Sequence, residues 1–272
     1  MLFLKTINKY FYAICICTLI IIYIHYMYIR TSDRRNTLLA PAMSPSGEWT
    51  VLVTVSSGYQ DMFDNWWHYF SLLKLSLHVI VVAEDNATYT RYKNNINFAV
   101  INGLNQSHGE KAFDYNTKQY KALVSKRPTY ILAFIKRGLN VIYTDVDTIW
   151  LKDPRSFLND HYDMWGSTDG PLYYCTGFMA FKPSPLSEDL LQKWKASLET
   201  PDINQVKFNS LVKKSAIRHK YLPRKEFPDG LMYFDRSMRS NVVVVHNNYI
   251  VGHDNKVERF KSVRLWWNNE GP

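Results

Sequence analysis

The sequence predicts an α/β fold, in which one membrane-spanning helix precedes a single domain of alternating strands and helices. Short apolar runs rich in β-branched residues recur along the chain and are typical of strands. Amphipathic stretches with helical spacing separate them, and a glycine or proline often marks the change from one element to the next. Such alternation is typical of a sheet with helices packed on its faces. The 272 residues are enough for one domain with a substantial core.

The first part of the predicted domain contains three strands and one helix. The strands are expected at residues 49–55, 77–83 and 98–101. A helix that contains Trp66 follows the first strand, with Asp64 as its expected N-cap. Ser56-Ser57-Gly58 lies directly after the first strand, where small residues allow a nucleotide to approach the backbone. Ser56 is therefore a candidate nucleotide-binding residue.

The strand predicted near the middle of the sequence is followed by two aspartates. An amphipathic helix at 120–137, broken or kinked by Pro128 and ended by Gly138, leads into the apolar run 141–143. Asp145 and Asp147 follow at its carboxyl end, where open α/β sheets bind ligands. Hard divalent cations prefer carboxylate oxygens and often share them with phosphates. An Asp-x-Asp pair also occurs in solvated turns, so it is the place at the end of a buried strand that favours a metal site.

The second half of the domain continues the alternation. Strands are expected at 163–170, 173–181 and 242–245, and helices at 186–198 and 204–212. Gly177 lies inside a strand, which indicates that another backbone or a ligand approaches closely there. The last strand leads into His246-Asn247-Asn248.

The N-terminal region predicts attachment to a membrane. Residues 11–29 are almost entirely apolar and long enough to span a bilayer as a helix. A cleaved signal peptide would have a shorter apolar region and a small-residue cleavage site, which is not evident. Basic residues flank the span on both sides, so charge does not decide its orientation. The expected organisation is a cytoplasmic tail at 1–10, a transmembrane signal-anchor at 11–29, a stem at 30–47 and a lumenal domain at 48–272.

Composition restricts the partners and the compartment. The net charge of +9 divides into +4 within residues 1–47 and +5 in the remainder, which suits an anionic ligand but not nucleic acid. Cys175 is the single cysteine of the predicted domain, so neither an internal disulfide nor a cysteine-based metal site is expected. The sequons at Asn86 and Asn105 favour a lumenal domain, in loop-like surroundings.

A series of short motifs occurs in a fixed order along residues 51–267. The motifs are Arg127-Pro128, Gly138, Tyr143-Thr144-Asp145-Val146-Asp147, Trp150-Leu151, Asp153-Pro154, Thr176-Gly177-Phe178, Asn204-Gln205, Phe208-Asn209 and His246-Asn247-Asn248, followed by Gly252 and Lys256. This series resembles the nucleotide-diphospho-sugar transferase family, and within it glycosyltransferase family 77, which includes Golgi xylosyl- and arabinosyltransferases. The resemblance implies a GT-A fold, with a Rossmann-like mixed sheet flanked by helices. It also implies a nucleotide-sugar substrate, usually used with Mn²⁺ (or Mg²⁺).

The resemblance assigns expected roles to these residues. The metal ligands are Asp145, Asp147 and His246, with His253 as the competitor of His246. The residues for the nucleotide sugar are Ser56, Arg127, Asp145, Gly252 and Lys256. The residues near the anomeric carbon and the acceptor are Asp169, Asn204 and Gln205. Three of them have a plainer alternative: a satisfied core histidine for His246, a surface lysine for Lys256 and a solvated helix face for Arg127.

The predicted function is a metal-dependent glycosyltransferase of the Golgi or ER membrane, single-pass and type II. It would transfer a sugar, xylose or galactose being favoured, from a UDP-sugar to a glycan or glycoprotein hydroxyl with retention. The chain departs from the family pattern at Asn204-Gln205, where Asp-Gln is common, and at Cys175, where Asn is common. A catalytically silent lumenal nucleotide-sugar-binding protein is therefore the alternative. A metal-dependent phosphohydrolase is a second alternative, although no nucleophile or third carboxylate for it is evident.

Overall fold

The computed structural model of the protein describes residues 47–103, 112–113, 115–159, 161–198 and 204–267. Within these ranges, no helix combines the length and the apolar character needed to cross a bilayer. The predicted tail, the anchor at 11–29 and the stem up to residue 46 lie outside the described residues, as does the sequon at Asn105.

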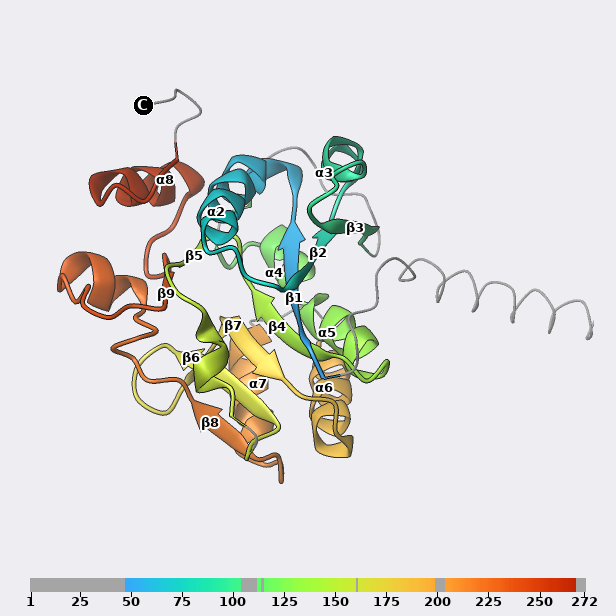
Figure 1. The fold of residues 1–272 in the computed structure, drawn as a ribbon. Coiled ribbons are helices and arrows are strands. Elements are labelled where there is room, and N and C mark those ends of the chain that lie inside the picture. Colours follow the sequence, from blue (N-terminus) through green and yellow to red (C-terminus); the bar gives the residue numbers. More distant parts are fainter. Residues whose placement is uncertain (1–46, 104–111, 114, 160, 199–203, 268–272) are drawn as a thin grey trace, which may run out of the picture. The chain divides into compact units, whose positions relative to one another are not determined.

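A mixed sheet of seven strands forms the centre of the domain, in the order β3-β2-β1-β4-β7-β6-β8 (Figure 1). Its strands are β1 (Trp49–Val55), β2 (His78–Ala83), β3 (Ala99–Asn102), β4 (Asn140–Thr144), β6 (Met164–Thr168), β7 (Tyr174–Phe181) and β8 (His219–Tyr221). The first four are parallel, whereas β7 is antiparallel to both of its neighbours, β4 and β6. The predicted mixed α/β sheet is confirmed, and the short strand β8 is an addition to the predicted set.

Helices connect and cover the strands. They are α2 (Gln60–Leu72), α3 (Asn86–Tyr92), α4 (Lys118–Val124), α5 (Arg127–Ile135), α6 (Pro185–Ser197), α7 (Asn204–Val212) and α8 (His253–Ser262), with short helical turns at Ser57–Tyr59, Pro154–Phe157 and Leu231–Asp235. The predicted helix at 120–137 is divided into α4 and α5. Pro128 lies in the first turn of α5, where its missing N–H costs nothing. Gly138 follows with φ +77°, a conformation that favours glycine.

Strand alternation builds a core on each face of the sheet. Val51, Val53 and Val55 of β1 point into a cluster with α2, α8 and the short strands β5 (Thr148–Trp150) and β9 (Val244–His246). Leu52 points the other way and is also fully buried. On that second face α5 packs on β4 and α7 on β7, while α6 packs against both helices. Both faces of the central strands are therefore covered, which explains their continuous apolar sequences.

A second, antiparallel sheet consists of β5 (Thr148–Trp150) and β9 (Val244–His246). Thr148 lies opposite His246 in this pairing, and the backbone N–H of Asn247 donates to the carbonyl of Asp147 at 2.9 Å. The strand predicted at 242–245 is shifted, since pairing begins at Val244 and includes His246. The small sheet therefore places His246, at the end of β9, beside Asp145 and Asp147, which follow β4.

Two local predictions are wrong. Asp64 does not cap a helix, because α2 begins at Gln60 and Asp64 accepts hydrogen bonds from Arg91 at 2.6 Å and Tyr92 at 2.8 Å. Asn86 does not lie in a loop, because it is the first residue of α3, which Asp85 caps by accepting from the Thr88 N–H at 2.8 Å. The Asn86 side chain is nevertheless exposed.

Candidate active site

A cavity of about 380 Å³ opens at the carboxyl ends of β1, β2 and β4. The strand order reverses between β1 and β4, and open α/β sheets bind ligands at such a point. All the residues that the sequence proposes for the site line this cavity. They are Ser56, Arg127, Asp145, Asp147, Asp169, Asn204, Gln205, His246, Gly252 and Lys256.

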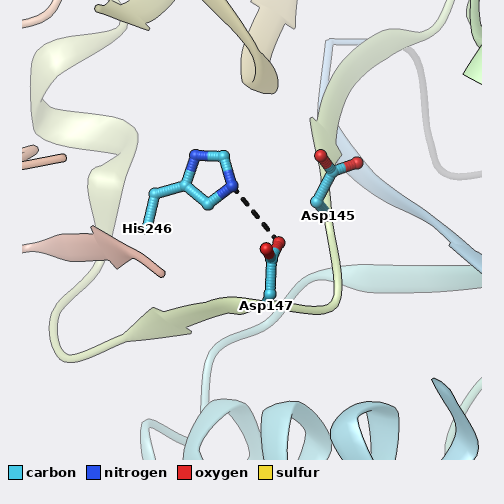
Figure 2. A group of neighbouring side chains, drawn as sticks. All are labelled: Asp145, Asp147 and His246. Atoms are coloured by element: carbon cyan, nitrogen blue, oxygen red, sulfur yellow. Dashed lines mark ion pairs between the residues drawn. The ribbon is translucent and has the colours of Figure 1, made fainter. Parts of the chain in front are cut away.

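Asp145, Asp147 and His246 form a compact group of possible metal ligands (Figure 2). One ligand atom from each residue lies within 4.8 Å of the others. Asp145 follows β4, Asp147 precedes β5, and His246 ends β9. The two carboxylates suit Mn²⁺ or Mg²⁺, and the imidazole is a ligand better suited to a transition ion, so the residues fit the Mn²⁺ that the family resemblance implies.

Asp147 is neutralised within the protein by two basic side chains. Its Oδ1 lies 3.2 Å from His246 Nε2, and Lys256 Nζ forms an ion pair with Oδ2. Burial raises the pKa of Asp147, but Lys256 and His246 outweigh burial and hold this pKa well below its usual value. Burial lowers the pKa of His246, whereas Cys175 and Asp147 together raise it well above the ordinary value. Only 14% of the Lys256 side chain is exposed, so the surface-lysine alternative is wrong.

Arg127 fixes the orientation of Asp145. The arginine is buried, and its Nη2 donates to Asp145 Oδ1 at 2.6 Å, while Nη1 donates to Thr176 Oγ1 at 2.7 Å. Its guanidinium lies 4.7 Å from the centre of the Tyr143 ring, and the Tyr143 hydroxyl donates to the same Asp145 oxygen at 3.0 Å. Burial lowers the pKa of Arg127, but Asp145 and Tyr143 more than compensate and raise it. A solvated helix face is therefore excluded as the role of Arg127.

Gly177 leaves the space in which this group assembles. A Cβ atom at this position would overlap the His246 ring and lie 2.7 Å from Asp145 Oδ2. Other atoms do approach Gly177 closely, but they belong to the side chains of Asp145 and His246 rather than to the ligand or second backbone that the sequence predicts. No side chain larger than hydrogen fits here without displacing one of them.

The other end of the cavity contains Asp169, which follows β6. Its carboxylate accepts from Gln205 Nε2 at 2.8 Å and from Asn248 Nδ2 at 2.5 Å. Gln205 in turn accepts from the Thr176 N–H at 3.1 Å. Asn204 is buried, and its Nδ2 donates to the Val124 carbonyl at 3.0 Å, which ties α7 to α4. Asp169 and Gln205 therefore form one hydrogen-bonded unit, whereas Asn204 supports the wall.

The remaining predicted residues frame the cavity. Ser56 is buried directly after β1, and Gly252, with φ +92°, precedes α8. His253, the competitor of His246, lies outside the group of metal ligands. Its Nε2 lies 2.9 Å from Asp61 and its Nδ1 lies 3.0 Å from Asp254. Of the two histidines, His246 is therefore the one that lies beside Asp145 and Asp147.

Several residues of the cavity wall are absent from the predicted set. Glu84 follows β2 and binds Lys126 Nζ at 2.9 Å; burial raises the pKa of its carboxyl. Cys175 Sγ lies 3.3 Å from His246 Nδ1. Asn248 and Tyr249 line the wall beside Asp169. The position after a buried strand could have indicated Glu84, and Cys175 and Asn248 flank or lie in the motifs, but no sequence pattern indicates Tyr249.

Two proteins with named activities are similar to this chain in sequence. The UDP-D-xylose:L-fucose alpha-1,3-D-xylosyltransferase 3 of Arabidopsis thaliana is 27% identical over 275 residues, which cover 88% of this chain and 72% of the relative. The UDP-galactose:fucoside alpha-3-galactosyltransferase of Dictyostelium discoideum is 28% identical over 207 residues, which cover 62% of this chain and 32% of the relative.

Solved structures share the fold. The glycosyltransferase GlyE of Streptococcus pneumoniae superposes with a TM-score of 0.52 at 12% identity, covering 84% of this chain and 66% of GlyE. A glycosyltransferase involved in glycosylation of the PBCV-1 major capsid has the same TM-score and identity, covering 80% of this chain and 99% of its own. A mixed α/β sheet with flanking helices, as the resemblance implies, is thus the architecture of known glycosyltransferases.

The sequence model of one family accounts for most of the described domain. It matches residues 74–260, which is more than half of the chain, and includes Asp145, Asp147 and His246. The chain therefore belongs to the nucleotide-diphospho-sugar transferase family.

Proposed function

We propose that this protein is a metal-dependent glycosyltransferase that moves a sugar from a UDP-sugar to a hydroxyl of a glycan or glycoprotein. The observation that carries the proposal is the convergence of Asp145, Asp147 and His246 in the cavity of a family member. Xylose and galactose are the proposed donor sugars, because they are named in the activities of the relatives. Fucose, named in both, is the proposed acceptor residue.

The residues proposed for the diphosphate lie at one end of the cavity, and those proposed for the acceptor lie at the other. Asp145, Asp147 and His246 would hold Mn²⁺ or Mg²⁺, which as a Lewis acid stabilises the negative charge of the departing diphosphate. Lys256, already beside Asp147, supplies a further positive charge for the same diphosphate. Arg127 holds Asp145 in place, and Ser56 leaves room for the nucleotide after β1.

The acceptor would bind at the end that contains Asp169 and Gln205. Their hydrogen-bonded carboxylate and amide can orient sugar hydroxyls. Retention is the proposed stereochemical course, because each of the four carboxylates that line the cavity is already engaged. Asp145, Asp147 and Glu84 are paired with basic side chains, and Asp169 accepts hydrogen bonds from two amides. The measurement is the anomeric proton signal of the fresh product, followed by NMR and compared with that of the donor.

The decisive experiment measures UDP release and sugar transfer by the full chain. UDP-xylose and UDP-galactose are supplied with methyl α-L-fucopyranoside, in Mn²⁺ and in EDTA, with the Asp147→Asn variant in parallel. Release that requires Mn²⁺ and Asp147 supports the proposal, and release that persists in EDTA and in the variant contradicts it. Metal-dependent binding of UDP without release from either donor would favour a silent nucleotide-sugar-binding protein instead.

We also propose a Golgi or ER membrane location, single-pass and type II, for the chain. The apolar segment at 11–29 supports a membrane anchor, and the exposed Asn86 is available as a lumenal glycosylation site. Resistance of the expressed protein to carbonate extraction, together with a mobility shift on glycosidase treatment that Asn86→Gln abolishes or reduces, is the expected result. Carbonate-soluble protein, or the absence of any glycosidase shift, would contradict this location.

A further inference from the structure

Tyr249 combines an exposed ring with an unfavourable backbone conformation. It is 56% exposed and has φ +58°, in the left-handed region that bulky residues seldom adopt. Seven non-glycine residues of the described chain have such a positive φ, and Tyr249 is the one among them that lines the cavity. Strained residues cluster at ligand sites, where the surrounding structure enforces them.

The chain on both sides of Tyr249 is firmly held. Asn248 donates to Asp169 at 2.5 Å and accepts from the Gly230 N–H at 2.6 Å through its side chain. Its carbonyl accepts from Arg259 Nη1 at 2.9 Å. On the other side, the Val251 carbonyl accepts from Asn255 Nδ2 at 2.8 Å. The strained conformation is thus imposed by bonds before and after Tyr249, and the ring itself is presented to the cavity.

The Tyr249 ring has no hydrogen bond or ring contact within the described part of the chain. Tyr115, another exposed aromatic of the wall, differs because it packs against Tyr120 with ring centres 5.2 Å apart. The neighbourhood of Tyr249 is polar: partial burial, and after it the charge of the nearby Asp169, raise the pKa of the Tyr249 hydroxyl to about 12. The apolar face of the Tyr249 ring lies beside the Asp169 carboxylate, which is hydrogen-bonded to two amides. This combination suits a pyranose, which offers both a C–H face and hydroxyls.

We propose that Tyr249 is the platform on which the acceptor sugar rests, with its ring against the C–H face of the pyranose and Asp169 at the hydroxyls. This inference rests on the proposed transferase function. The acceptor, rather than the donor sugar, is assigned here because an acceptor belongs to a larger glycan and needs a wall that is open to solvent. The transferred sugar, by contrast, lies between the diphosphate and the acceptor.

The backbone conformation offers a test that separates binding from structure. Tyr249→Gly removes the ring and also relieves the positive φ, so the variant should unfold at an equal or higher temperature. The dissociation constant for methyl α-L-fucopyranoside, measured by NMR with UDP and Mn²⁺ present, should nevertheless increase at least about tenfold. In turnover, the acceptor KM should rise by a similar factor, with a much smaller change in kcat.

Leu172→Gly is the matched control. Leu172 also has a positive φ, +54°, and is 69% exposed, but it does not line the cavity. Its replacement should relieve the same kind of strain and leave the dissociation constant unchanged. Equal affinity of Tyr249→Gly and the unmodified protein, no binding of the fucoside by the unmodified protein, or a loss of affinity shared by Leu172→Gly would each overturn the inference. Because binding is read without turnover, failure of the transferase proposal shows separately, as absent UDP release.

Discussion

Thr148 lies directly opposite His246 in the antiparallel pairing of β5 with β9. This register brings Asp147, the residue before Thr148, into contact with both His246 and the backbone N–H of Asn247. The geometry of the candidate metal site is therefore set by a small sheet that is separate from the seven-stranded one. Substitution of Asp147 or His246, which this sheet brings together, should therefore weaken metal binding more than it destabilises the fold.

Replacing Asp147 with Asn should abolish tight Mn²⁺ binding. The substitution keeps the size of the side chain but removes the charge that Lys256 and His246 neutralise, so affinity should fall at least about 100-fold. Free Mn²⁺ measured by electron paramagnetic resonance reports this directly. Asp153→Asn is the control, because Asp153 pairs with Arg155 outside the cavity lining. Unchanged Mn²⁺ affinity in Asp147→Asn would show that the ion does not bind here.

Gly177→Ala should block the site by steric overlap. The added methyl group would overlap the His246 ring, so Mn²⁺ affinity should fall about 10–100-fold and stability by about 1–3 kcal/mol. Gly166→Ala provides the comparison, because Gly166 lies in β6 and the added Cβ would overlap a different side chain, 2.7 Å from Tyr174 Cδ1. We expect a similar loss of stability there without a loss of Mn²⁺ affinity. Equal Mn²⁺ affinities of the two variants, measured by titration calorimetry, would contradict this account.

Cys175 should act on the metal site through His246. Its Sγ lies 3.3 Å from His246 Nδ1, and partners of a ligating histidine typically contribute about 10–100-fold to metal affinity. Cys175→Ala should therefore weaken Mn²⁺ binding by about tenfold, whereas Cys175→Ser, which can still hydrogen-bond to the ring, should recover most of the affinity. If the two variants bind Mn²⁺ equally, the thiol has no role in orienting the histidine.

His253 should make stability depend on pH. A hydrogen bond to Asp61 raises its pKa to about 9, against the opposing effect of partial burial. Because the pKa in the unfolded chain is about 6.5, the stabilisation is complete below pH 6.5 and is lost as the pH rises through 9. Since Asp61 is half exposed, screening limits the contribution to about 1 kcal/mol.

The measurement for His253 is urea unfolding of the unmodified protein and of His253→Gln. The variant should be less stable by about 1 kcal/mol at pH 6 and nearly equal at pH 9.5. A difference of the same size at both pH values would mean that the histidine contributes by packing against Tyr59 rather than by its charge.

Periodicity predicts the elements with the strongest apolar patterns. The strand at 49–55 and the helix at 204–212 have the predicted bounds. The strand is an almost continuously buried run, and the buried residues of the helix recur at helical spacing. The helix α8 is missing from the prediction, since Val257 and Phe260 are its only buried residues within a strongly polar stretch. The strand β8 is three half-buried residues long, too short for a pattern to show.

The residues of the candidate site can be predicted from the sequence, but the strand pairing that brings them together cannot. Position after a strand and family motifs indicate Asp145, Asp147 and His246, yet no local pattern reveals that β5 pairs with β9. The role of Arg127 likewise depends on its burial against Tyr143, which a helical sequence does not show. No sequence pattern indicates Tyr249, because its backbone conformation is imposed by the contacts of Asn248 with Asp169, Gly230 and Arg259.

The pairing of β5 with β9 has a consequence for the ribosome-bound chain. All seven strands of the main sheet have been synthesised once residue 221 has emerged, whereas the partner of β5 begins only at Val244. A nascent or truncated chain that ends between these points can therefore complete its large sheet while Asp147 still lacks His246 and Lys256. The ability to capture a divalent cation would then appear only after the main sheet is complete, once synthesis has passed His246 at the end of β9.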